Sequence, residues 1–342
     1  MTAPAARAFA PGRCTAVGEH VDYADGVVVC MAVHLGVEVT LSAGAAGAES
    51  AYVAATLQSL RERGVAVPPV GARIAATLPA GAGLSSSAAL CCATAVAALR
   101  LAGARLSAAE LCDVALHAER DIVGVPCGPL DQRAVVLAPA GGALVLDCRD
   151  GTAVPVPWPA GFVLAACHTG EAHDVGGEGY RSRRAQADAA LQALRARSWR
   201  DVAAAQADAL DDPLLRRRAR HVVSETQRAC ECAQALRSGD AARVGALMSA
   251  SHASLRDDYE VSTPALDAAV AAAEAVAGCL GARMVGAGFG GTAVALVEER
   301  HAQECLDAMR SSAEGLGQES AGAWLLSPSP GLAALAPDVI SA

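Results

Sequence analysis

The chain has 342 residues, of which 53% are hydrophobic, and a formal net charge of −9. A chain of this length predicts one large or two ordinary domains, and its acidic balance argues against a general nucleic-acid binder, which usually carries a basic face. All 27 residues counted as lysine or arginine are arginines. The chain therefore has no Walker-A lysine, no protein-kinase strand lysine and no lysine for a Schiff base.

The 12 cysteines are scattered and form no Cys-x-x-Cys pair, so no zinc ribbon is predicted. Most of them stand in apolar runs, where they are expected to be buried small hydrophobic side chains. No apolar window predicts a membrane span, and the first residues do not read as a signal peptide. We therefore expect a reduced, cytoplasmic environment.

In chain order, the first half alternates apolar strand-like runs with helices. Residues 1–9 are expected to be loose, and strands are predicted at 14–18, 27–33 and 37–41, where β-branched residues gather. Small residues at 42–50 predict a linker. The elements expected after it are helices at 52–63, 87–101 and 107–121, the last opened by a capping box, and strands at 74–78, 135–137 and 143–147.

A loop rich in glycine and serine lies between the strand at 74–78 and the helix at 87–101. Glycine lets a backbone approach a ligand closely, serine is expected to cap the helix, and a helix N-terminus suits a phosphate. We interpret the loop as a cradle for nucleotide phosphates, the alternative being a tight turn before a well-capped core helix. The residues expected to contact the nucleotide are Gly81, Ala82, Gly83, Leu84, Ser85, Ser86 and Ser87.

A proline-rich stretch, Pro155–Pro159, predicts a boundary that divides the chain into domains 1–157 and 158–342. The second domain is expected to be rich in helices, with Thr263 and Pro264 opening one of them. The elements expected there are helices at 180–197, in several segments to about 254, and at 264–277, and strands at 162–167, 283–285, 292–297 and 323–326, before a loose tail. The pattern is α+β in two domains.

Three motifs resemble those of the GHMP kinases, galactokinases among them, and follow the order of that family. Pro11–Tyr23 is similar to the galactokinase signature, Pro79–Leu90 to the phosphate loop, and Gly286–Gly291 to a third, glycine-rich motif. The resemblance implies a two-domain fold, with an N-terminal domain like ribosomal protein S5 and a ferredoxin-like, helix-rich C-terminal domain. The active site is expected between the two.

The resemblance also implies a reaction, the transfer of the ATP γ-phosphate to the anomeric hydroxyl of galactose. Asp131 would be the base beside that hydroxyl, and Arg13 would lie between Asp131 and the phosphates as an electrostatic stabiliser. Ser87 and Glu119 would hold Mg²⁺, which favours few protein ligands plus phosphate oxygens. From the residues alone, an aspartate in a surface turn is the favoured interpretation of Asp131. Glu119 reads as an ion-pair partner of Arg120 or Arg133.

Five residues are implied as sugar contacts. Carboxylates accept hydrogen bonds from adjacent hydroxyls and histidine can donate or accept, so the histidine is expected to bind the sugar and not to catalyse. These residues are Glu19, His20, Asp22, Gly128 and Tyr180. The glycine would let the backbone approach the sugar, and the tyrosine would lie against it.

The chain departs from the family pattern at Val21 and Ala24, where threonine and asparagine are usual, and it is short at 42–50. Two rival functions therefore stay open. One is a 1-kinase for another aldose or a uronic acid, and the other is an inactive sugar- and nucleotide-sensing regulator. The intact serines of 85–87 and Asp131 favour an enzyme. The expected partners are a sugar and ATP, without nucleic acid or membrane, and the expected assembly is a monomer or weak homodimer.

Overall fold

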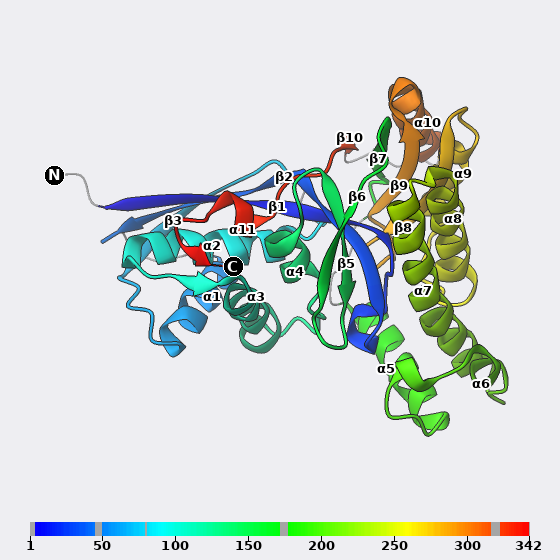
Figure 1. Cartoon of the computed structure of the whole chain (residues 1–342), viewed down its shortest axis with the longest axis horizontal. Helices are drawn as coiled ribbons and strands as arrows, with labels where there is room; N and C mark the ends of the chain where they lie inside the picture. Colours follow the sequence, from blue (N-terminus) through cyan, green and yellow to red (C-terminus); the bar gives the residue numbers. More distant parts are fainter. Residues whose placement is uncertain (1–3, 45–49, 79–80, 172–176, 316–321, 342) are drawn as a thin grey trace.

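The computed structural model describes residues 4–44, 50–78, 81–171, 177–315 and 322–341 (Figure 1). Pro79 and Ala80, at the start of the expected phosphate loop, and residues 45–49 of the expected linker lie outside the described residues. The described residues form two antiparallel sheets, a small two-stranded parallel sheet and helices, so the α+β prediction is confirmed. None of the helices described is long and apolar enough to span a membrane.

The first sheet has the order β1-β2-β5-β6, and β3 also pairs with β2. Its strands are β1 (Ala5–Val17), β2 (Val27–Ala43), β3 (Val70–Ala76), β5 (Gly142–Asp147) and β6 (Ala153–Pro157). The predicted strands 27–33 and 37–41 are one strand, because β2 stays paired with β1 across a register shift opposite Pro11 and Gly12. The prediction of a loose start is wrong for residues 5–9, which pair with β2.

Helices α1–α4 lie on one side of this sheet (Figure 1). They are α1 (Ala51–Glu62), α2 (Ser86–Ala102), α3 (Ala108–His117) and α4 (Leu130–Leu137), with a π-helical turn at Ala118–Val123. Helix α2 packs on β1 and β2 through small buried alanine and cysteine side chains, which let helix and sheet approach closely. The predicted capping box of Ser107 and Glu110 is confirmed.

The strand predicted at 135–137 is wrong. These residues are the last turn of α4, and Val135 and Val136 are fully buried there. A short apolar run does not distinguish a strand from a buried helical turn, and here the run continues a helix that begins at Leu130. The carboxylate at 131 therefore stands on the first turn of a helix and not at the end of a loop.

The second sheet has the order β10-β7-β9-β8. Its strands are β7 (Phe162–His168), β8 (Cys279–Val285), β9 (Thr292–Glu298) and β10 (Gly322–Leu326). The helices of this half are α5 (Glu178–Ala193), α6 (Ala204–Asp208), α7 (Pro213–Ser238), α8 (Ala241–Asp257), α9 (Pro264–Glu274) and α10 (Ala302–Gly315). As expected, Thr263 caps α9, accepting from the Leu266 N–H. Helix α7 contacts both α8 and β2, so it joins the two halves.

The tail after Pro328 folds onto the protein as far as residue 341, so the prediction of a loose tail is wrong for residues 329–341. Helix α11 (Leu332–Leu335) packs against α4, and β11 (Ile340–Ser341) pairs with β4 (Leu106–Ser107). Arg100 binds both carboxylate oxygens of Asp338, at 2.7 and 2.8 Å. The last described residues therefore pack against elements of the first half of the chain. The domain boundary near 157 stays a prediction.

Candidate active site

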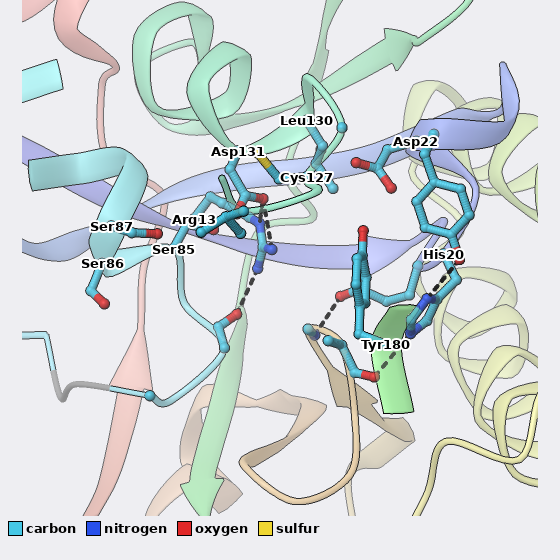
Figure 2. Close-up of a pocket in the computed structure, with 18 residues that line it drawn as sticks. Arg13, His20, Asp22, Ser85, Ser86, Ser87, Cys127, Leu130, Asp131 and Tyr180 are labelled. Atoms are coloured by element: carbon cyan, nitrogen blue, oxygen red, sulfur yellow. Dashed lines mark hydrogen bonds and ion pairs between the residues drawn. The ribbon is translucent and has the colours of Figure 1, made fainter. Parts of the chain in front are cut away.

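One pocket, of about 780 Å³ including space open to solvent, is lined from both halves of the chain (Figure 2). Twelve of the predicted site residues line it: Arg13, Glu19, His20, Asp22, Gly81, Gly83, Ser85, Ser86, Ser87, Gly128, Asp131 and Tyr180. Ala82 and Leu84 are instead buried in the core, and Glu119 is buried and bonded to Ser87.

The glycine and serine loop reaches the second half of the chain at Gly83. That residue has a φ of 68°, and a Cβ there would lie 2.9 Å from the Val285 carbonyl oxygen, so a side chain would force the loop away. The expectation that serine caps α2 is wrong for Ser85. Its backbone is left-handed, with a φ of 61°, and its side chain makes no cap hydrogen bond. In the described structure its buried hydroxyl has no partner, so the hydroxyl and the helix N-terminus remain available to a ligand.

Arg13 and Asp131 form the centre of the pocket. The Arg13 Nε donates to Asp131 Oδ1 at 2.8 Å, and Nη2 lies 2.7 Å from the same oxygen. Its Nη1 donates to the Gly83 carbonyl at 2.6 Å. Burial alone would lower the pKa of Arg13, but Asp131 and Glu19 outweigh it and raise that pKa above its usual value. The guanidinium therefore stays charged and joins the carboxylate to the phosphate loop.

Glu119 lies behind Ser87. The Ser87 hydroxyl donates to Glu119 Oε1 at 2.6 Å, and the Gln132 amide donates to Oε2 at 2.7 Å. Burial raises the pKa of Glu119 to about 7. The alternative of an ion pair with Arg120 finds no support, since Arg120 pairs with Asp121 at 3.0 Å.

The residues that were predicted as sugar contacts lie at the other end of the pocket. Glu19 is buried, and its Oε1 accepts from the Gly286 N–H at 2.7 Å. Both ring nitrogens of His20 are engaged within the protein, Nδ1 by the Tyr23 hydroxyl and Nε2 by the Ala287 carbonyl. The Asp22 carboxylate and the Tyr180 ring face each other across the pocket (Figure 2).

The space for Asp22 is provided by Gly128. A Cβ built on Gly128 would lie 2.0 Å from Asp22 Oδ2. The glycine was expected to let backbone approach the sugar, whereas its nearest neighbour here is a protein carboxylate. A side chain at 128 would therefore meet the Asp22 carboxylate, and the expected approach of the backbone to the sugar stays a prediction.

The sequence analysis did not predict the buried residues that hydrogen-bond the backbone of the galactokinase-like signature. Glu225, fully buried on α7, accepts from the Gly18 N–H at 2.8 Å, and His221 bonds the Glu19 carbonyl at 3.1 Å. Six further residues line the pocket without having been predicted as contacts: Tyr23, Val125, Cys127, Leu130, Gly286 and Ala287. All six stand within a predicted motif or near a predicted site residue, which was the available signal. Glu225 and His221 lay on a helix with no such signal.

Three family models match this chain. They are the galactokinase galactose-binding signature at residues 2–43, the GHMP kinases N terminal domain at 51–138 and the GHMP kinases C terminal at 232–315. Galactokinase of Roseiflexus sp. is 40% identical over 84% of this chain and 82% of its own length. Galactokinase of Mycobacterium bovis is 36% identical over 95% of this chain and 98% of its own length.

The chain belongs to the galactokinases of the GHMP kinase family. The structure of Lactococcus lactis galactokinase complexed with galactose superposes with a TM-score of 0.89 at 28% identity, covering 96% of this chain and 94% of that one. L. major mevalonate kinase, at 20% identity and a TM-score of 0.71, shares the fold and covers 95% of this chain. The fold predicted from the three motifs is thereby confirmed.

Asp22 gives this family member a stability that depends on pH. Burial, with Asp131 and Glu19 nearby, raises the pKa of Asp22 from 3.8 to about 7. The folded chain therefore holds a proton that the unfolded chain loses, so the stability from this group is complete below pH 3.8 and is lost as the pH rises through about 7.

Asp22→Asn is accordingly expected to raise Tm at pH 8, by about 2 °C, and to change it less at pH 4.5. Melting curves across this pH range measure the effect. Asp150→Asn is the matched control, because that exposed carboxylate has a pKa lowered by hydrogen bonds from Thr152 and should give no gain. An Asp22→Asn protein that melts no higher than wild type at pH 8 would contradict the assignment.

Proposed function

We propose that this chain transfers the γ-phosphoryl group of ATP to the anomeric hydroxyl of galactose, giving galactose 1-phosphate. The observation that supports it best is the Arg13 guanidinium, which bonds Asp131 on one side and Gly83 of the phosphate loop on the other. This arrangement puts a carboxylate and a cation between a sugar-side pocket and a loop suited to phosphates. Membership of the galactokinases supplies the sugar and the nucleotide.

In the proposed mechanism Asp131 accepts the proton of the anomeric hydroxyl as the hydroxyl oxygen attacks the γ-phosphorus. A base must lie within hydrogen-bond reach of that proton, and the Asp131 side chain lines the pocket and is 24% exposed. Arg13 holds the carboxylate in place and offsets negative charge on the transferring group. The loop from Gly81 to Ser87, with its free serine hydroxyl at 85, would bind the phosphates.

The donor set of Ser87 and Glu119 fits a magnesium ion on the nucleotide. Both donors are hard oxygens, and Mg²⁺ takes few protein ligands beside phosphate oxygens and water. Among the described residues there is no group of three or more His, Cys, Asp or Glu side chains placed for a metal, so the ion would depend on the nucleotide for further ligands. When bound, it would neutralise phosphate charge, and Glu119, whose pKa burial raises to about 7, would be held ionised beside it.

On the sugar side, Asp22, Glu19 and Tyr180 are proposed as contacts. A carboxylate at 22 can accept from sugar hydroxyls, while Glu19 has one oxygen already bonded to Gly286. His20 is proposed to meet the sugar through its ring face or edge, since protein partners occupy both ring nitrogens.

A coupled ADP-release assay tests the proposal. Purified protein with Mg-ATP and galactose is expected to release ADP, and galactose 1-phosphate is expected as the product. Arabinose and galacturonate in place of galactose are the comparison sugars. Faster turnover with either would retain the mechanism and reassign the substrate, and sugar binding without any ADP release would overturn the kinase proposal.

Gly128→Ala is expected to raise the KM for galactose at least about tenfold, because the new methyl group would displace the Asp22 carboxylate. The KM for ATP should stay within about twofold. Steady-state kinetics with each substrate varied in turn measure both. Gly141→Ala is the control, since that glycine also has an unusual φ, of 68°, but open space around it. An unchanged galactose KM in Gly128→Ala would contradict the role given to Asp22.

A cytoplasmic location and a monomer or weak homodimer complete the proposal. Eight of the cysteines are buried as free thiols, which pack as small hydrophobic side chains. Free thiols are typical of a reducing compartment such as the cytoplasm.

A further inference from the structure

Four aromatic rings close the sugar side of the pocket. The His20 ring lies 5.6 Å from Tyr180, 4.9 Å from Tyr259 and 6.1 Å from Tyr23, measured between ring centres. Tyr23 and Tyr180 line the pocket, whereas Tyr259 is fully buried behind it. His20 also has a φ of 61°, an unusual conformation for histidine that its surroundings must hold.

A chain of three hydrogen bonds runs through this cluster. The hydroxyls of Tyr259 and Tyr23 are 2.8 Å apart, the Tyr23 hydroxyl is 3.0 Å from His20 Nδ1, and His20 Nε2 is 2.9 Å from the Ala287 carbonyl. Burial lowers the pKa of His20 to about 3, so the ring is neutral at physiological pH and carries one N–H.

These hydrogen bonds all donate in one direction, and the Ala287 carbonyl at the end of the row determines which direction it is. A carbonyl oxygen only accepts, so the single N–H of the His20 ring must be on Nε2. Nδ1 is then an acceptor of the hydrogen bond from the Tyr23 hydroxyl, which leaves the Tyr23 oxygen to accept from the Tyr259 hydroxyl at 2.8 Å. The Arg183 carbonyl, at 3.4 Å, is the more distant acceptor for the Tyr259 hydroxyl. The order of donation is Tyr259 to Tyr23 to His20 to Ala287.

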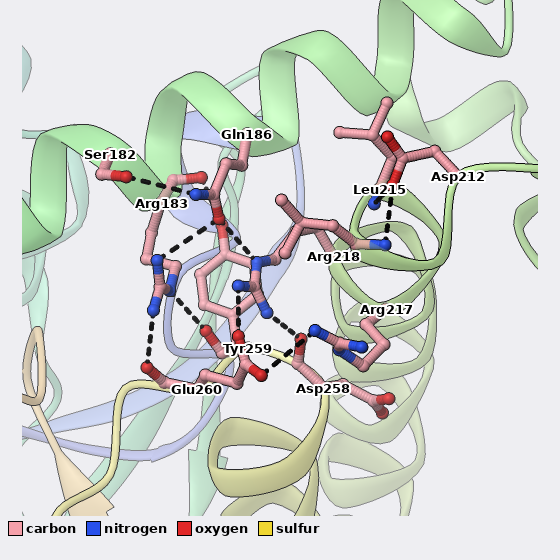
Figure 3. A network of polar contacts seen from close by, with 11 residues as sticks. Ser182, Arg183, Gln186, Asp212, Leu215, Arg217, Arg218, Asp258, Tyr259 and Glu260 are labelled. Atoms are coloured by element: carbon pink, nitrogen blue, oxygen red, sulfur yellow. Dashed lines mark hydrogen bonds and ion pairs between the residues drawn. The ribbon is translucent and has the colours of Figure 1, made fainter.

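The first donor is held by two arginines (Figure 3). Arg218, 1% exposed, donates to the Asp258 carbonyl and the Glu260 carboxylate, both at 2.5 Å. Arg183 donates to the Tyr259 carbonyl at 2.7 Å and to the Glu260 carbonyl at 3.0 Å. The backbone on both sides of Tyr259 is therefore tied to α5 and α7, and the phenol has little freedom to turn.

We propose that Tyr259 is a positioning residue of the sugar site, which acts through Tyr23 to hold His20 as the Nε2–H tautomer with its ring fixed as a wall of the pocket. These hydrogen bonds join three separate segments: the signature, the turn that follows α8, and the glycine-rich loop that carries Ala287. Because Glu19 also binds that loop at Gly286, the position of the His20 ring and that of the Glu19 carboxylate are linked. The sugar-binding part of the inference rests on the proposed function.

The discriminating variant is Tyr259→Phe, which removes one buried hydroxyl that does not line the pocket. The Kd for galactose, by calorimetry, and its KM are expected to rise about fivefold, while kcat and the KM for ATP stay within about twofold. Tyr23→Phe, which leaves His20 Nδ1 without its donor, should have the larger effect, about tenfold. Tyr52→Phe is the matched control, since Tyr52 stands on α1 outside the pocket lining and should change neither galactose value.

Nuclear magnetic resonance of protein labelled with ¹⁵N-histidine supplies the second readout, with the His20 signals assigned by their loss in His20→Gln. The wild type should show a protonated Nε2 and an unprotonated, hydrogen-bonded Nδ1. The Nδ1 signal should move toward the value of a free nitrogen in Tyr23→Phe, and by less in Tyr259→Phe. A general loss of structure would move all eight histidines instead.

A protonated His20 Nδ1 in the wild type would contradict the proposed direction of the hydrogen bonds. An unchanged galactose affinity in Tyr259→Phe would contradict the positioning role of Tyr259. If the wild type neither binds nor phosphorylates galactose, the proposed function and the sugar-site role both fail. The Nδ1 measurement would then still decide the direction of the hydrogen bonds.

Discussion

Asp131→Asn should lower kcat for galactose phosphorylation by about a thousandfold and change the KM for galactose by less than about fivefold. The amide keeps the shape of the side chain and can still accept from Arg13 through its oxygen, so the geometry around the guanidinium is preserved. It cannot take the proton of the attacking hydroxyl. The loss should therefore appear in the chemical step and not in binding, as ADP-release kinetics at saturating galactose and ATP would show.

Asp338→Asn is the matched control for this change. Asp338 also forms a close carboxylate–arginine pair, with Arg100, but it lies beside β11, away from the pocket. Its loss should leave kcat unchanged and lower only Tm. If Asp131→Asn retained a tenth or more of the wild-type kcat, Asp131 would be a binding residue and another group would have to accept the proton.

The motifs of the sequence were sufficient to predict most of the pocket. Arg13 and Asp22 stand in the galactokinase-like signature and Asp131 stands on a distant helix, yet the family resemblance gave each of them a role. Strand β1, the turn after it and α4 bring all three into the pocket. The failures were of local structure. Apolar runs of three to five residues were interpreted as strands or loops at 135–137 and after 328, because their burial depends on partners elsewhere in the chain.

The supports of the site could not be predicted in the same way. Tyr259 bonds Tyr23 across 236 positions, and Glu225 bonds Gly18 across 207. Nothing in the local pattern around Glu225 distinguishes a buried partner of the signature from an ordinary helix residue. The segment 254–261, which contains Tyr259, resembles the family's sequence, but that resemblance does not identify Tyr23 as its partner. Likewise, the left-handed backbone of Ser85 is a property of the folded loop, and serine at a helix start normally indicates a side-chain cap.

Glu225 and Tyr259 share one physical feature: each buries a polar or charged group against the galactokinase-like signature. Glu225 is completely buried, and although burial would raise its pKa, Arg228, Arg283 and other neighbours lower that pKa to about 2. Such a group stabilises the fold only while its partners remain in place. The signature is thus fixed from the second half of the chain, which is why a pocket made mostly of first-half residues needs both halves to keep its shape.

Arg13→Met should lower kcat by about a hundredfold to a thousandfold, the second-largest effect that we expect. Methionine keeps much of the length and apolar stem of arginine but removes the charge and all three polar contacts, two to Asp131 and one to Gly83. The Asp131 carboxylate then loses its positive partner, and Gly83 of the phosphate loop is no longer joined to Asp131 through Arg13. Arg13→Lys, which keeps the charge but not the contact of two nitrogens with Asp131 Oδ1, should give a kcat between those of Arg13→Met and wild type.

The control is Arg7→Met on the same strand, whose side chain is 69% exposed and pairs with Glu38 away from the pocket. It should leave kcat unchanged. The decisive comparison is with the double variant Arg13→Met/Asp131→Asn. If Arg13 acts in part by holding Asp131, the two losses must be less than additive, because an arginine has less to position once the base is gone. Full additivity in ADP-release kinetics would mean that Arg13 acts on the phosphoryl group alone, and a single Arg13→Met variant within tenfold of wild type would exclude both roles.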